Sequence, residues 1–168
     1  NLIYITAEGF DTIAVDKELT PTLYKLVNNS FIFKNYYQPL YSLRTSDGEY
    51  MALNGLLPKE GVWSFYRSSF IDMPYGLGNV FKKMGYKEIN AYHDHTYKFY
   101  DRNLSHPNLG FDYKGCGNVL EKLINCNIWP ESDLEMINAT IDDYIDSDSF
   151  VTYYMTVSGH LNYTFKDN

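Results

Sequence analysis

The feature that most restricts the fold of this chain is a short, almost unbroken apolar run at residues 2–7. The run reads Leu-Ile-Tyr-Ile-Thr-Ala, so it is rich in β-branched residues and has no polar face. Such a pattern is typical of a strand that is covered on both faces in a parallel sheet. Sheets of this kind occur in α/β proteins, and we therefore expect helices to separate the strands that follow.

The rest of the sequence has this alternation. Helical patterns occupy residues 20–27, 46–56, 78–86 and 131–146, with Thr20 and Pro21 at one helix start and Gly85 at one helix end. Further strand patterns occupy residues 30–37, 87–92 and 150–157. Because no internal repeat or linker interrupts them, the patterns predict one α/β domain with a mainly parallel sheet over residues 1–168.

Charge and composition narrow the classes of function. The 168 residues include 14 Lys and Arg against 21 Asp and Glu, which gives a formal net charge of −7. This balance argues against binding of nucleic acid, so any phosphate site must be local. The 17 tyrosines suit the walls of a cleft for a polar ligand, although an ordinary core explains them equally well. Cys116 and Cys126 fit neither a redox motif nor a zinc motif, and they can pair or stay free.

The sequence has no apolar run long enough to span a membrane, and its first residues lack the pattern of a signal peptide. It begins directly in an apolar strand without an initiator Met. We therefore expect a soluble piece of a longer protein, whose targeting or membrane segments lie elsewhere.

Polar side chains stand at the ends of several predicted elements. Glu8 follows the first strand, Thr45 precedes a helix, and His93 and His160 follow the last two strands. Open α/β sheets hold their ligands at the carboxyl ends of the strands, so these residues are candidates for one site. A lone histidine such as His160 is more often structural, and only its place at a strand end makes it a candidate.

Thr45 belongs to the stretch Arg44-Thr45-Ser46-Asp47, where a helix is expected to begin. The N–H groups and partial positive charge of a helix N-terminus favour an alkoxide and an adjacent anion, so Thr45 suits a nucleophile if a metal reaches its oxygen. The alternative is that Thr45 or Ser46 merely caps the helix, with Glu49, three residues after Ser46, completing a capping box. Both interpretations can hold together, because a cap at Ser46 leaves Thr45 free.

Residues 93–102 concentrate two His, two Asp, one Arg and three aromatic residues. Histidines and carboxylates at this density can bind a divalent metal, and an arginine among aromatic rings can hold a phosphate or a sugar. A solvated polar loop is the alternative for any single residue. The chain has no P-loop, G-x-S-x-G, G-x-G-x-x-G or H-E-x-x-H motif, so nucleotide folds, serine hydrolases and zincins lose their main support.

Taken in order, these pieces resemble the extracellular catalytic domain of the lipoteichoic acid synthase family, phosphoglycerol transferases of the alkaline phosphatase/sulfatase superfamily. The matching stretches are residues 1–10, 20–23, 44–50, 85–86, 93–102, 109–112, 129–133 and 154–160. The resemblance implies a three-layer α/β/α fold with a mainly parallel central sheet, incomplete on its C-terminal side. Residues 1–168 then form the N-terminal part of a single sulfatase-like catalytic domain.

The resemblance also implies roles for single residues. Glu8 looks like the family's metal-binding carboxylate, and Thr45 looks like its threonine nucleophile, which also touches the metal, Mn²⁺ or Mg²⁺. The residues that match contacts to the substrate phosphate and glycerol are His93, His95, Tyr100, Arg102 and His160. His95 replaces an acid of the family and Tyr100 replaces a tryptophan, which puts the exact substrate in question but not the phosphotransfer chemistry. A threonine nucleophile argues against sulfatase chemistry, which uses formylglycine made from Cys or Ser.

We therefore expect a metal-dependent phosphoglycerol transferase of lipoteichoic acid synthesis. It would take glycerolphosphate from an anionic phospholipid, through a phosphothreonine intermediate, at the extracellular face of a bacterial cell membrane. The alternatives are a phosphodiesterase or phosphatase with the same centre, and an inactive envelope domain that binds glycerolphosphate polymers. The family completes its metal site with an Asp-His pair, which does not follow His160 here. We expect those ligands in the remainder of the catalytic domain, and no activity from this chain alone.

Overall fold

A computed structural model describes residues 1–37 and 44–160. Within them, four strands form one parallel sheet: β1 (Leu2–Thr6), β2 (Glu88–Thr96), β3 (Asp112–Cys116) and β4 (Phe150–Met155). Their order across the sheet is β1-β4-β2-β3, so the first and last of these strands in the sequence are neighbours. The α/β class and the parallel sheet that the sequence predicts are confirmed.

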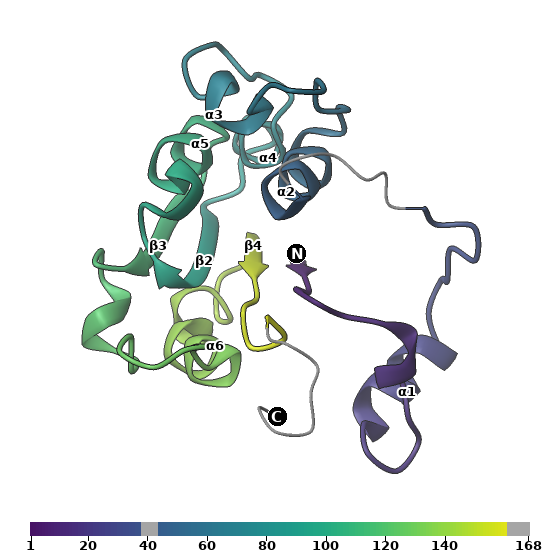
Figure 1. The fold of residues 1–168 in the computed structure, drawn as a ribbon. Helices are drawn as coiled ribbons and strands as arrows, with labels where there is room; N and C mark the ends of the chain where they lie inside the picture. The colour runs from purple at the N-terminus through teal and green to yellow at the C-terminus, as the bar shows by residue number, and fades with distance from the viewer. Residues whose placement is uncertain (38–43, 161–168) are drawn as a thin grey trace.

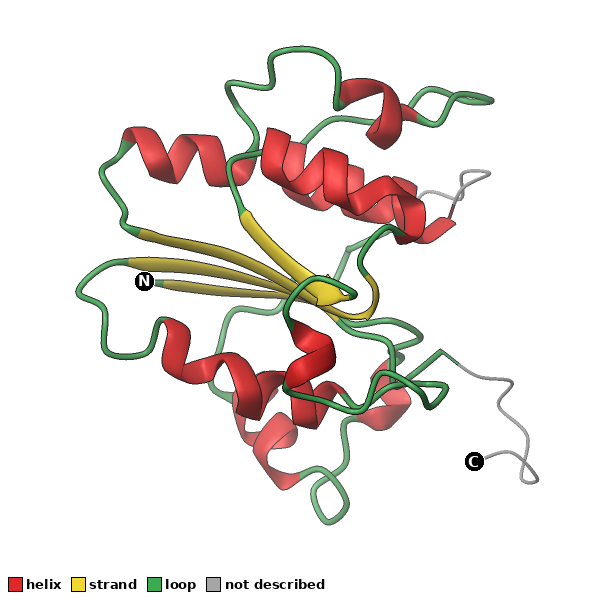
Figure 2. Ribbon diagram, turned by 90° about the vertical axis from the view of Figure 1, so that its left-hand side faces the viewer, coloured by secondary structure: helices red, strands yellow, loops and turns green. Residues whose placement is uncertain are grey.

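Helices cover both faces of this sheet (Figure 1, Figure 2). One face carries α2 (Arg44–Asn54), α3 (Ser64–Ser68), α4 (Leu77–Lys83) and α5 (Arg102–Asn108), and the other carries α6 (Asp133–Thr140). Short 3₁₀ turns lie between these elements: η1 (Thr12–Ala14), η2 (Phe99–Asp101), η3 (Leu120–Lys122) and η4 (Ile141–Asp143). This is the expected three-layer α/β/α arrangement.

The alternation of side chains along the central strands divides the core into two parts. On β4, Val151, Tyr153 and Met155 pack under one helical layer. Phe150 and Tyr154 pack under the other. Every residue of β4 is buried. A strand covered on both faces favours an apolar side chain at most positions, which explains the nearly unbroken apolar run in the sequence.

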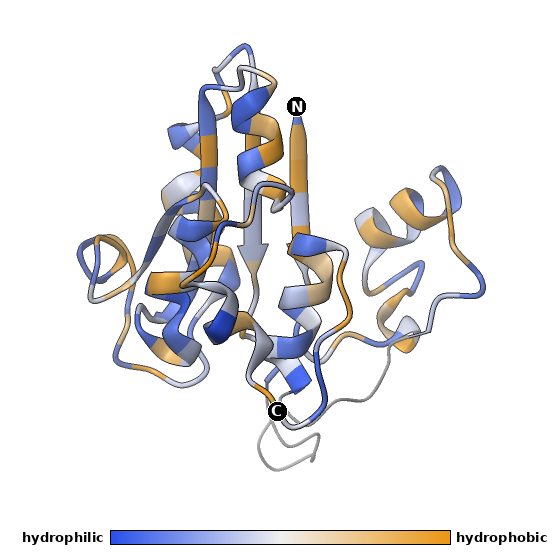
Figure 3. Cartoon of the chain, turned by 90° about the horizontal axis from the view of Figure 1, so that it is seen from above, coloured by the Kyte–Doolittle hydropathy of each residue, from blue (hydrophilic) through white to orange (hydrophobic). Residues whose placement is uncertain are grey.

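β1 is less covered than its sequence predicts. Tyr4 packs against the core, whereas Ile3 and Ile5 are 48% and 50% exposed. Beyond β1, the helix α1 (Pro21–Asn28) lies apart from the sheet (Figure 1), and apolar positions on both elements appear orange in Figure 3. The prediction of a strand covered on both faces is therefore wrong for β1 in the described residues, because its outward side chains are half exposed.

Two strand predictions also differ from the structure. Residues 30–37 form no strand and are all exposed. An apolar run becomes a strand only where a neighbouring strand satisfies its backbone N–H and C=O groups, and this run pairs with none of the four described strands. The sequence does not predict β3, whose five residues include Asp, Lys and Gly and which lies at the edge of the described sheet. β2 continues to Thr96, so His93 and His95 belong to a strand and not to a loop.

The helix boundaries shift by a few residues. α2 begins at residue 44 and not at 46. The pattern at 131–146 divides into α6, where the Ser132 hydroxyl accepts the Glu135 N–H at 3.3 Å, and η4. None of the helices within residues 1–37 and 44–160 has the length and apolar character needed to cross a membrane.

Candidate active site at the carboxyl ends of the strands

A cavity of about 370 Å³ lies where β1, β2 and β4 end. All seven residues that the sequence singles out line it: Glu8, Thr45, His93, His95, Tyr100, Arg102 and His160. Five further residues complete the wall: Phe99, Trp129, Met155, Thr156 and Val157. Seven of the twelve lining residues are thus candidates from the sequence, whereas the other five and the pairings within the cavity come from the structure.

Glu8 and Thr45 meet at this cavity although 37 residues separate them in the sequence. The Thr45 hydroxyl donates to Glu8 Oε2 at 3.1 Å. The Glu8 backbone N–H donates to the Thr156 hydroxyl at 2.9 Å. Gly159 also lies against Glu8, where any Cβ would overlap the Glu8 carbonyl oxygen, so this close approach requires glycine. The loops after β1 and β4 therefore fix the carboxylate beside the hydroxyl.

The first turn of α2 does not form the capping box that the sequence allows. Because the helix begins at residue 44, Thr45 and Ser46 both lie within its first turn. The Ser46 hydroxyl accepts the Trp63 indole N–H at 2.9 Å. The Glu49 carboxylate contacts Arg102 and not the helix end. The capping-box alternative is therefore wrong, and Thr45 is the hydroxyl of this turn that lines the cavity.

Arg102 lines the cavity from within a buried ion pair. Its Nε donates to Glu49 Oε2 at 2.9 Å and its Nη2 lies 2.7 Å from the same oxygen, and neither side chain is more than 1% exposed. His106 and Tyr153 also reach Glu49, at 3.5 Å and 3.2 Å. Burial acts to raise the pKa of Glu49, but Arg102 and His106 outweigh it and hold that pKa below its ordinary value. Since Glu49 and Thr45 share α2, one helix positions both the hydroxyl and the guanidinium.

His93 is a neutral member of the site. The ring is almost fully buried, and Nδ1 donates to the Met155 carbonyl oxygen at 3.0 Å. Burial and, after it, the charge of Arg102 hold the pKa of His93 well below its ordinary value. His93 therefore presents a neutral ring to a ligand, with Nε2 as its acceptor nitrogen.

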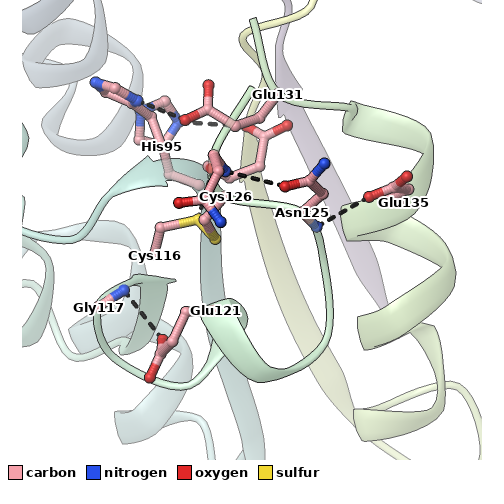
Figure 4. The surroundings of a disulfide bond; sticks show 11 residues. His95, Cys116, Gly117, Glu121, Asn125, Cys126, Glu131 and Glu135 are labelled. Carbon is pink, nitrogen blue, oxygen red and sulfur yellow. Dashed lines mark hydrogen bonds and ion pairs between the residues drawn. A yellow bond between two sulfur atoms is a disulfide. The ribbon is translucent and has the colours of Figure 1, made fainter. Parts of the chain in front are cut away.

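His95 pairs with Glu131, for which the sequence predicts no role. Its Nδ1 lies 2.8 Å from Glu131 Oε1 (Figure 4). The ring meets Phe99 and Trp129 edge to face, at 5.0 Å between centroids in each case. Trp129 also contacts the ring of His160 at 5.3 Å. Nothing local in the sequence distinguishes Glu131 from the other acids near α6; only its contact across 36 residues reveals it.

Asp94 and Asp133 form a carboxyl pair beneath the loop that carries His160. Asp94 is fully buried, and neither of its oxygens meets a hydrogen-bond donor among the described residues. Burial first and the Asp133 charge second raise the pKa of Asp94 to about 8. Asp133 in turn accepts the N–H groups of Val157 and Ser158 at 2.7 and 3.1 Å. Asp133 thereby holds the start of the loop after β4.

A disulfide closes the segment that leads to Trp129 and Glu131. Cys116, the last residue of β3, is bonded to Cys126, with the two Cα atoms 5.9 Å apart (Figure 4). Cys116 Sγ also lies 2.9 Å from the Asp94 carbonyl oxygen. The cross-link therefore ties this segment to the sheet beside His95, and it settles the pairing that the sequence leaves open.

Glu8 and Thr45 offer two oxygen donors, which is the ligand type that Mg²⁺ and Mn²⁺ prefer. The donor atoms of Glu8 and Thr45 are therefore of the type that such a cation binds. Across residues 1–37 and 44–160, however, no cluster of three or more His, Cys, Asp or Glu side chains is placed to hold a metal ion. The pair therefore suits one part of a metal site, which further ligands would have to complete.

The sequence of this chain matches one family model and is similar to known proteins. The sulfatase family model matches residues 1–168. Lipoteichoic acid synthase 2 of Bacillus subtilis is 29% identical over 120 residues, which cover 67% of this chain and 18% of that protein. The lipoteichoic acid synthase-like protein YvgJ of the same organism is 24% identical over 119 residues, which cover 67% of this chain and 19% of that protein. The chain thus spans about a fifth of the length of these relatives.

The fold agrees with the sequence comparison. The crystal structure of the lipoteichoic acid synthase LtaP from Listeria monocytogenes matches with a TM-score of 0.79 at 22% identity, over 96% of this chain and 41% of that one. The resemblance and the fold class inferred from the sequence are therefore confirmed. The chain is similar to lipoteichoic acid synthases, and it belongs to the sulfatase family.

Proposed function

We propose that this chain provides the nucleophile side of a metal-dependent phosphoglycerol transferase. The observation that carries the proposal is the contact of the Thr45 hydroxyl with Glu8 Oε2 at 3.1 Å, on the wall of a cavity that Arg102 also lines. A hydroxyl beside a carboxylate and a fixed cation suits a nucleophile that attacks a phosphate ester. The similarity to lipoteichoic acid synthase 2 supports glycerolphosphate as the group that moves.

In the proposed reaction, the Thr45 oxygen attacks the phosphorus of a phospholipid headgroup while its proton passes to Glu8. The bond between phosphorus and the oxygen of the lipid alcohol breaks, and a phosphothreonine remains. Arg102 suits the non-bridging phosphate oxygens, because Glu49 already fixes the orientation of its guanidinium. An acceptor alcohol then attacks the phosphothreonine and releases Thr45. With water as the acceptor, the same residues would act as a hydrolase.

A divalent cation held by Glu8 and Thr45, Mn²⁺ or Mg²⁺, would lower the pKa of the hydroxyl and offset the charge at the phosphate. We assign its other ligands to the remainder of the same catalytic domain, because this chain covers only 41% of the LtaP chain that it matches. We further propose that the whole protein is anchored at the outer face of a bacterial membrane, where its anionic phospholipid substrate lies. The isolated chain should accordingly be inactive.

The test uses the full-length protein with Mn²⁺ and phosphatidylglycerol in detergent micelles, and it measures the release of diacylglycerol. Thr45→Ala should lower the rate by a factor on the order of 10³ or more, because the covalent route is lost. Thr22→Ala, on the exposed surface of α1, is the matched control and should leave the rate unchanged. Mass spectrometry should find a glycerolphosphate adduct on the peptide that contains Thr45.

Two outcomes would contradict the proposal. Undiminished turnover in Thr45→Ala would remove Thr45 from the mechanism. A wild-type protein that binds glycerolphosphate polymer but releases no diacylglycerol would instead support an inactive binding domain.

A further inference from the structure

We propose that His95 and Glu131 form an acid–base dyad that moves the protons of the two alcohols in the transfer reaction. The inference rests on the proposed function and deepens it, because it gives His95 a catalytic role beyond contact with the substrate. Glu131 is the positioning residue of the dyad, since it acts through His95.

The dyad is defined by one short contact. His95 Nδ1 lies 2.8 Å from Glu131 Oε1, and the Glu131 side chain is only 4% exposed (Figure 4). The second oxygen of Glu131 has no hydrogen-bond partner among the described residues. A buried carboxylate with a single partner accepts the Nδ1 proton of that partner, which fixes the tautomer and leaves Nε2 for the reaction.

The ring of His95 is held where a substrate can reach it. Its side chain is 23% exposed and lines the same cavity as Thr45. Phe99 and Trp129 meet the ring edge to face, at 5.0 Å between centroids in each case. Aromatic contacts together with one charged hydrogen bond limit the rotation of the imidazole, as proton transfer at a defined atom requires.

The other two histidines of the cavity are less suited to this task. His93 donates Nδ1–H to a carbonyl oxygen, and burial together with Arg102 keeps it neutral. His160 contacts Trp129 through its ring, and within the described residues no carboxylate contacts its imidazole. His93 Nδ1 also lies 3.9 Å from Asp94 Oδ1, which is beyond hydrogen-bond distance. Among the three cavity histidines, His95 is therefore the one with a carboxylate within hydrogen-bond distance of its imidazole.

The protons balance over the two half-reactions. In the first, Thr45 Oγ1 bonds to phosphorus, the bond from phosphorus to the lipid alcohol oxygen breaks, and that oxygen takes the proton from His95 Nε2. In the second, the neutral Nε2 takes the proton of the acceptor hydroxyl, whose oxygen bonds to phosphorus as the bond to Thr45 breaks. Glu8 returns to Thr45 Oγ1 the proton that it took in the first half-reaction. Over one cycle His95 thus gives one proton and takes one back, and Glu131 accepts the Nδ1–H bond in both forms of the ring.

Leaving groups of different basicity separate this role from simple binding. The full-length protein is assayed with phosphatidylglycerol, whose alcohol needs a proton to leave, and with glycerol 4-nitrophenyl phosphate, whose aryloxide leaves without one. His95→Asn should lower the first rate with the lipid by about 10²–10⁴-fold. With the aryl ester, the rate of the 4-nitrophenolate burst in His95→Asn should stay within about tenfold of the wild-type rate. The turnover that follows the burst should be slow, because the second half-reaction still lacks its base.

Variants of Glu131 test its positioning role. Glu131→Gln keeps an oxygen acceptor for Nδ1–H but removes the charge, so it should show the same selective loss with the lipid, to a smaller extent. Glu131→Asp should restore part of the lipid activity. Thermal unfolding midpoints of all variants report whether the fold is intact, and the aryl-ester burst shows that the site itself still works.

The outcomes distinguish the dyad from the proposed function. Equal losses of the lipid rate and of the aryl-ester burst in His95→Asn would overturn the dyad and leave His95 as a binding residue. A burst that persists in Thr45→Ala would overturn the proposed nucleophile, whatever His95 does. A wild type without release from either substrate would overturn both.

Discussion

Replacing Asp94 with Asn should change how the stability of this protein depends on pH. Burial and the Asp133 charge raise the pKa of Asp94 to about 8 in the fold, against about 3.9 in an unfolded chain. Between these values the folded state binds a proton that the unfolded state lacks, so the free energy of unfolding falls as the pH rises. The slope is about 1.4 kcal/mol per pH unit. An amide at this position contributes no such slope.

From pH 5 to pH 7 the wild type should therefore lose about 3 kcal/mol of stability relative to Asp94→Asn. The difference in the free energy of unfolding between the wild type and Asp94→Asn should be constant below about pH 4 and again above the folded-state pKa of about 8. Urea unfolding followed by tryptophan fluorescence, at half-unit steps of pH, measures it. Asp142→Asn, which removes an exposed carboxylate, is the matched control. A difference that stays constant from pH 4 to 8, or a wild type that gains stability relative to Asp94→Asn as the pH rises, would refute a protonated Asp94.

Two further changes test the supports of the site. Cys126→Ser opens the disulfide and should destabilise the protein by about 3 kcal/mol, because the unfolded chain gains conformational freedom. Calorimetry measures this loss of stability. Dithiothreitol should lower the stability of the wild type but not that of the variant. Equal stability of variant and wild type would contradict a role for the cross-link. Glu49→Gln leaves the Arg102 charge buried without its partner and should destabilise the domain by about 3–5 kcal/mol in urea unfolding. The double variant Glu49→Gln/Arg102→Met should recover part of this loss, and no recovery would place the effect elsewhere.

The coverage of each strand decided how well the sequence predicted it. β4 is buried on both faces, so its apolar run is long and easily recognised. β3 is short, lies at the edge of the described sheet and includes Asp112 and Lys114, so no pattern marks it. Residues 30–37 have a strand-like sequence but no neighbouring strand, and hydrogen bonds between strands are not encoded locally.

The site shows a similar division. Glu8, Thr45 and His160 could be predicted because each stands where an element begins or ends, and such places gather at one edge of a parallel sheet. The two carboxylates that position the site, Glu49 and Glu131, could not be predicted from the sequence. Glu49 lies 53 residues from Arg102 and Glu131 lies 36 residues from His95, so each contact depends on the complete tertiary fold.

The pairing of β1 with β4 also sets the order in which the site can assemble during synthesis. The Glu8 N–H bonds to Thr156 across 148 residues of sequence, and a ribosome needs on the order of 10 s to add that length. Until then the apolar side chains of β1 belong to a strand without its β4 partner, which chaperones or other nascent chains can bind. Glu8 is fixed beside Thr45 only after β4 has docked, so an unfinished chain carries the hydroxyl long before its carboxylate is held in place.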